Sequence, residues 1–139
     1  MAQLVFAVTL APLINMIPAF GEEAGWRGML FPNLALRFSP RMAVLIGGAI
    51  WGLWHAPITV MGHNYGLGYA GWPVAGILAM IVFCTSLGSC LSYLRVRAES
   101  VWPCALAHGA INAISGIGLY FSSVGATLLG PSPAGHVDW

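Results

Sequence analysis

The sequence predicts an all-α membrane protein, a polytopic helical bundle of about four to five transmembrane helices. We expect residues 1–139 to form a single domain. Two observations predict this class. Charged residues make up 6% of the chain and hydrophobic residues 58%, whereas a soluble domain carries about 25% charged residues. The apolar runs are continuous and do not alternate with polar residues, which favours helices over barrel strands.

Proline residues and charge clusters divide the chain into helical segments. We expect Pro12 and Pro18 to interrupt the first segment and Ser39-Pro40 to open the third. Pro103 lies in the first turn of the last segment, where its missing N–H costs little. The predicted segments are residues 3–17, 19–37, 41–61, 73–94 and 101–121.

The third and fourth segments come from one uncharged stretch. From Met42 to Leu94 there are 53 residues without an Asp, Glu, Lys or Arg. One span needs about 20 residues, so this stretch predicts two helices and a turn. Glycines mark the turn at residues 62–73, and its tyrosines and tryptophan suit a membrane interface.

Arginine positions orient the predicted bundle. The loops 37–41 and 95–100 carry two arginines each, whereas loop 62–73 has no formal charge. Two crossings separate the two arginine-bearing loops, so they share a side of the membrane. The positive-inside rule assigns that side to the cytoplasm and predicts that loop 62–73 is external.

The composition also narrows the class of partners. The net charge is +1, which provides no basic field for nucleic acid, so we expect no nucleic-acid partner. Membrane lipids are the expected surroundings. The three cysteines include no CxxC pair, which argues against a disulfide framework or a thiolate zinc site.

A few polar residues lie inside the apolar segments. A charge at the centre of a membrane helix costs roughly 2.5–3.5 kcal/mol, so such residues are functional candidates. They are Glu22, Glu23, Arg27, His55 and His108, with Asn112 as a neutral companion.

Spacing assigns partners to some of these candidates. Glu23 and Arg27 are i,i+4 neighbours with the acid first, the better orientation for an ion pair. Glu22 points about 100° away on a helix and lacks that partner. His108 and Asn112 are also i,i+4 neighbours and face one way.

Each candidate also has a purely structural interpretation. The acids could cap a helix N-terminus, and the histidines and Asn112 could be polar contacts between packed helices. A pair of Cys104 with His108 lacks the positive surroundings that a thiolate needs.

Taken together, three helices each place a carboxylate or an imidazole inside the bilayer, and the least costly partners for these groups are one another. We therefore expect one shared polar cavity. Its carboxylate, imidazoles and amide are suited to hydrolysis, because they provide a base for water and donors for an oxyanion.

These motifs resemble those of the CPBP family of intramembrane proteases, the CAAX protease and bacteriocin-processing family. The family pattern is Glu-Glu-xxx-Arg, then an aromatic residue-xxx-His, then His-xxx-Asn. The resemblance covers about residues 15–120, and the family's second motif usually begins with Phe. This chain has Glu22-Glu23-xxx-Arg27, Trp51-xxx-His55 and His108-xxx-Asn112.

The resemblance implies an intramembrane endopeptidase related to the CAAX prenyl endopeptidase, acting on prenylated CAAX-type or leader-type peptides. It implies that Glu22 and His55 activate a water molecule. It also implies that His108 and Asn112 stabilise the oxyanion. Glu23 and Arg27 would orient the site.

A cofactor is not favoured, because Asn112 beside His108 suits oxyanion donation. Zinc is the alternative, because Glu22, His55 and His108 are adequate zinc ligands.

Two other functions stay open. A chain with this fold could be a catalytically inactive bacteriocin-immunity or binding protein. It could also be a small proton-relay or transport subunit that uses its buried acid and histidines. Members of the family carry further helices on both sides of this core, so we expect the chain to be a fragment or a minimal member.

Overall fold

The computed structural model describes residues 2–115, and this part of the chain is built of helices joined by turns and by one longer loop, residues 61–73. The all-α prediction is therefore confirmed for these residues, and the end of the last predicted segment, 116–121, lies outside them. The elements are α1 (Ala2–Gly25), η1 (Trp26–Leu30), α2 (Phe31–Ala35), α3 (Pro40–Trp54), α4 (Ala56–Val60), α5 (Val74–Ala98) and α6 (Trp102–Ser115).

Helix α1 continues through Pro12 and Pro18, so the predicted interruptions at both prolines are wrong. A proline removes one backbone hydrogen bond, but a helix in an apolar medium can continue where a neighbouring helix packs on it. Helix α6 is that neighbour. Its Gly109 lies so close that a Cβ there would be 2.8 Å from the Pro12 oxygen and 2.6 Å from the Met16 nitrogen.

The two acids consequently lie within a continuous helical run. After Gly25 the chain makes one turn of π-helix, η1, and then continues into α2. The alternative that Glu22 and Glu23 cap a helix N-terminus is therefore wrong. Single π-turns inside helices are frequent at functional sites.

The predicted third segment is broken at His55, where α3 ends and α4 begins. Pro57 favours the break, because it has no N–H to donate to the Leu53 carbonyl and its ring would clash with that carbonyl. The His55 N–H bonds to the Gly52 oxygen at 3.2 Å. The carbonyl of Trp51 is thereby released from the usual i→i−4 bond.

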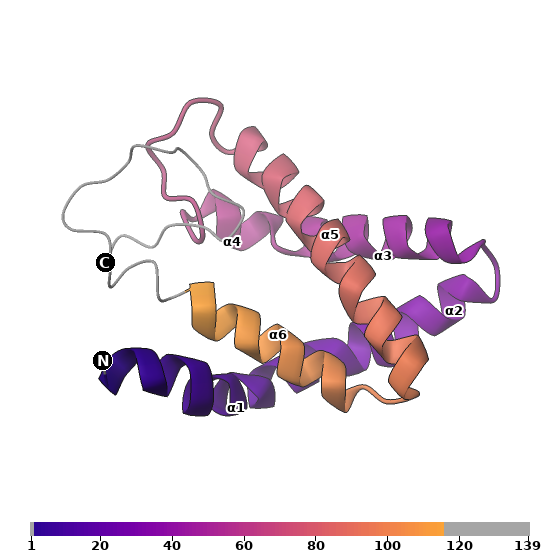
Figure 1. Cartoon of the computed structure of the whole chain (residues 1–139). Helices are drawn as coiled ribbons and strands as arrows, with labels where there is room; N and C mark the ends of the chain where they lie inside the picture. Colours follow the sequence, from indigo (N-terminus) through magenta and orange to yellow (C-terminus); the bar gives the residue numbers. More distant parts are fainter. Residues whose placement is uncertain (1, 116–139) are drawn as a thin grey trace.

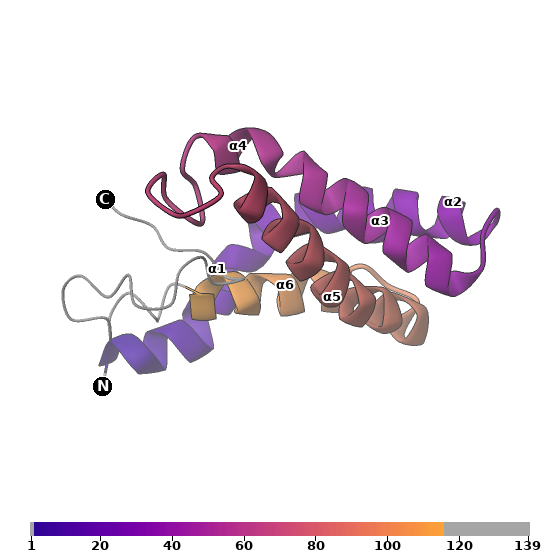
Figure 2. The ribbon, with the colours of Figure 1, turned by 90° about the horizontal axis from the view of Figure 1, so that it is seen from above.

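Two helix pairs form the body of the fold. Helix α1 lies along α6, and α3 crosses α5 (Figure 1 and Figure 2). Glycines permit the second crossing, and the Gly48-xxx-Gly52 spacing is of the kind that lets two helix backbones approach closely. A Cβ on Gly48 would lie 2.5 Å from the Thr85 Cα, and one on Gly52 would lie 2.8 Å from the Ile81 nitrogen.

Gly52→Ala is expected to lower the free energy of unfolding by about 1–3 kcal/mol, the usual cost of overpacking. The new methyl would lie 2.8 Å from the Ile81 nitrogen, so the backbone of α5 or α3 would have to shift. Gly47→Ala is the matched control, because its methyl would lie 3.7 Å from the flexible Leu34 side chain. Thermal unfolding in detergent measures both. Equal melting temperatures for the two variants would contradict close packing of α3 on α5.

The turns between the helices lie at two opposite ends of the bundle. The α2–α3 and α5–α6 turns lie at one end and the loop between α4 and α5 at the other (Figure 1 and Figure 2). The chain therefore runs from one arginine-bearing turn to the opposite end of the bundle and back to the other, which is consistent with the two crossings predicted between them. Among the described helices, one is long and apolar enough to cross a membrane, α5. The number of spans remains a prediction.

Candidate active site

Glu23 is the centre of the buried polar cluster, and its side chain is 0% exposed. Arg27 Nη1 donates to Glu23 Oε1 at 3.0 Å, which confirms the predicted i,i+4 pair. His108 Nδ1 lies 2.9 Å from the same oxygen. Glu23 Oε2 has no hydrogen-bond partner among the described residues. One carboxylate oxygen thus links α1 and η1 to α6.

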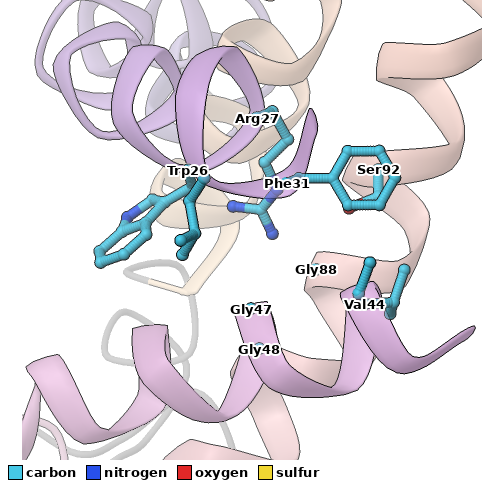
Figure 3. A pocket seen from close by; sticks show the side chains of 10 residues that line it. Trp26, Arg27, Phe31, Val44, Gly47, Gly48, Gly88 and Ser92 are labelled. Atoms are coloured by element: carbon cyan, nitrogen blue, oxygen red, sulfur yellow. The ribbon is translucent and has the colours of Figure 1, made fainter. Parts of the chain in front are cut away.

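Arg27 is buried between several elements and leaves a small cavity beside it. Its guanidinium carbon lies 4.4 Å from the centre of the Trp51 ring. Gly88 on α5 makes room for it, since a Cβ there would be 2.8 Å from Arg27 Nη2. The cavity, between η1, α3 and α5, has a volume of about 10 Å³ (Figure 3). That is about the space of one water molecule.

Glu22 is held by an interaction that the spacing rules did not predict. The indole Nε1 of Trp51 donates to Glu22 Oε2 at 3.0 Å, across 29 positions of sequence. Glu22 is partly buried. Its other oxygen, Oε1, makes no hydrogen bond within residues 2–115, so it is available to another donor.

His55 lies at the break between α3 and α4. Its Nδ1 is 2.9 Å from the Trp51 carbonyl oxygen. A carbonyl only accepts, so Nδ1 carries the proton, and in the neutral ring Nε2 is an acceptor. The Trp54 indole packs edge-on against His55 at 5.0 Å between ring centres. These contacts fix both the tautomer and the ring orientation.

The two predicted α6 residues differ in their surroundings. His108 is buried, and its ring packs edge-on against Trp51 at 5.2 Å between centres. Asn112 lies one turn farther along α6 and is exposed, and its side chain makes no hydrogen bond in the described part of the chain. Cys104 donates to the Leu91 carbonyl at 3.2 Å, so its thiol is directed at α5 and not paired with His108.

The structure therefore joins five of the six predicted residues around Trp51 and leaves Asn112 apart. The joining is by direct contact: Glu22, His55 and His108 do not line the cavity beside Arg27. These residues form a packed cluster, and the cavity beside Arg27 is not the expected shared one. Trp51, 2% exposed, was not among the predicted site residues. The signal that could have found it is its place at the head of the second motif, where an indole stands instead of a phenyl ring.

The zinc alternative stays a prediction. Among the described side chains, no three His, Cys, Asp or Glu residues are grouped closely enough to hold one metal ion. Glu22 Oε2 accepts from Trp51 and the Nδ1 atoms of both histidines are bonded to protein oxygens, which leaves Glu22 Oε1 and the two Nε2 atoms as the ones that could ligate a metal.

The sequence matches a known protein family over most of its length. Residues 3–114 match the model of the family described as type II CAAX prenyl endopeptidase Rce1-like. The chain belongs to this family. The family is one of integral membrane proteases, so the resemblance inferred from the three motifs is confirmed.

One curated relative is also similar. It is the CAAX prenyl protease 2 of Methanococcus maripaludis, 34% identical over 62 residues. The aligned stretch is 43% of this chain and 23% of the relative, so the match spans about a quarter of that protein. No solved structure matches the chain.

Proposed function

We propose that the chain is an intramembrane endopeptidase that hydrolyses a peptide bond of a prenylated CAAX-type peptide. Membership of the Rce1-like family supports the reaction and the substrate class. The observation that carries the proposal is the link through Trp51. Trp51 hydrogen-bonds to the Glu22 carboxylate on α1 through its side chain and to the His55 imidazole at the end of α3 through its backbone carbonyl.

Glu22 and His55 activate the attacking water in this proposal. Glu22 Oε1 takes one proton from the water, whose oxygen forms a bond to the peptide carbonyl carbon. His55 Nε2 accepts a hydrogen bond from the water's other O–H and orients it. The proton on Glu22 then passes to the departing amine nitrogen as the C–N bond breaks.

His108 and Asn112 stabilise the oxyanion of the tetrahedral intermediate. His108 bonds to Glu23 through Nδ1, so its Nε2, when protonated, is the atom that donates to the oxyanion. Asn112 is outside the packed cluster in this structure, and we propose that its side-chain amide, one turn along α6 from His108, becomes the second donor when substrate is bound. Glu23 and Arg27 act indirectly, because their ion pair holds the His108 ring in place.

The proposed orientation in the membrane places the arginine-bearing end of the bundle in the cytoplasm. Arg37 and Arg41 flank the α2–α3 turn, and Arg95 and Arg97 lie in the last turn of α5. The positive-inside rule assigns this end to the cytoplasm. The loop between α4 and α5 is then external.

Purified protein in detergent is expected to release a tripeptide from a farnesylated peptide that ends in a CAAX sequence. The same peptide without the farnesyl group is the matched control, and we expect it to be cleaved more slowly. Mass spectrometry identifies both products. A protein that unfolds cooperatively yet cleaves neither peptide would contradict the proposal and favour an inactive binding or immunity protein.

The same assay tests metal dependence. We propose that the reaction needs no metal, so turnover should survive a chelator, and elemental analysis should find far less than one zinc per chain. Loss of turnover in the chelator, restored by adding zinc, would overturn this part of the proposal without affecting the substrate class.

A further inference from the structure

We infer that Trp51 is a positioning residue that aligns both water-activating groups, Glu22 through its side chain and His55 through its backbone. The inference rests on the proposed function and deepens it. It concerns how one residue fixes the distance between the base and its companion imidazole, which catalysis by proximity requires.

The side-chain contact depends on the indole ring. Trp51 Nε1 donates to Glu22 Oε2 at 3.0 Å, and an indole N–H can only donate. One carboxylate oxygen is thereby fixed, and Oε1 is left for the water. A phenyl ring, usual at this position in the family that the motifs resemble, has no such donor. The hydrogen bond to Glu22 is therefore a feature of Trp at this position.

The backbone contact depends on the helix break. In an uninterrupted helix the Trp51 carbonyl would accept the His55 N–H, but at the α3–α4 junction that N–H bonds to Gly52 instead. The released Trp51 carbonyl accepts a hydrogen bond from His55 Nδ1 at 2.9 Å. Trp51 thus holds both reactive side chains, Glu22 and His55.

Trp51 itself is held rigidly, which a positioning residue requires. It is 2% exposed, and its ring packs on the Arg27 guanidinium at 4.4 Å and on the His108 ring at 5.2 Å. The Trp26 ring lies 6.3 Å away between centres. A displacement of the indole would therefore also disturb the Arg27–Glu23–His108 group, which its ring contacts.

Trp51→Phe is the test, because it keeps an aromatic ring and the backbone carbonyl but removes the Nε1 donor. We expect kcat for the farnesylated peptide to fall by about 10- to 100-fold while KM changes by less than about twofold. Trp102→Phe is the matched control. It makes the same chemical change in a ring that stacks on Phe20 at 4.3 Å, and we expect its kcat to be unchanged.

A spectroscopic readout tests the hydrogen bond without relying on turnover. In protein labelled with 15N-tryptophan, the indole N–H signal of Trp51 is expected to move upfield in Glu22→Gln, because an amide oxygen is a weaker acceptor than a carboxylate. The Trp51 signal is identified by its absence from the Trp51→Phe spectrum. Where that variant does not fold, nuclear Overhauser effects to the His108 ring identify it.

The outcomes separate this inference from the proposed function. If Glu22→Gln is inactive but Trp51→Phe turns over normally, the inference is overturned and the proposed function stands. An indole signal that does not move in Glu22→Gln also overturns it. If wild-type protein cleaves no peptide, the proposed function fails, and the indole signal still decides whether Trp51 holds Glu22.

Discussion

Glu22→Gln is expected to lower turnover of a farnesylated peptide by about 100- to 10,000-fold, the usual contribution of a general base. The fold should be retained, because a glutamine oxygen can still accept from Trp51 Nε1, the bond that holds this side chain. Glu22 is not in the Arg27 ion pair, so the substitution leaves no buried charge without a partner. Single-turnover cleavage followed by chromatography measures the effect.

Glu99→Gln is the matched control for that prediction. Glu99 is exposed and follows the last residue of α5, so it makes the same change of acid to amide away from the cluster. We expect its turnover to equal that of the wild type. Wild-type turnover by Glu22→Gln would show that another group activates the water.

Glu23→Gln is expected to lower the free energy of unfolding by about 3–5 kcal/mol, the usual cost of removing one partner from a buried ion pair. Glu23 is 0% exposed and Arg27 3% exposed, so neither can be reached readily by water. The substitution would leave the Arg27 charge buried and would weaken the contact to His108. Chemical denaturation in detergent measures the loss.

The double variant tests whether the stranded charge causes that loss. Glu23→Gln combined with Arg27→Gln removes both charges, so we expect it to be more stable than Glu23→Gln alone. Such a recovery is the coupling that a double-mutant cycle detects. If the two substitutions lower stability additively, the ion pair is not the source of the effect.

Local rules explain the parts of the site that the sequence predicted. Glu23 and Arg27 are one helical turn apart, and their pairing forms even though the backbone changes to a π-turn at Trp26. The glycines at 48 and 52 mark the close crossing of two helices because only a residue without a Cβ fits there. Such inferences need no knowledge of distant residues.

The other contacts depend on packing between helices far apart in sequence. His108 reaches Glu23 across 85 positions and Trp51 reaches Glu22 across 29, and neither contact follows from residue spacing. The prolines show the same limit. Pro18 leaves α1 unbroken beside α6, whereas Pro57 accompanies the break at His55. A proline's local effect is similar in both places, so the surrounding packing decides the outcome.

The most direct test of this account measures turnover and melting temperature together for Glu22→Gln and Glu23→Gln, in the same detergent. We expect the two effects to separate. Glu22→Gln should lose turnover and keep the wild-type melting temperature, whereas Glu23→Gln should lose melting temperature as well. If Glu22→Gln is destabilised as much as Glu23→Gln, or if it remains active, the division between a reactive and a structural carboxylate is wrong.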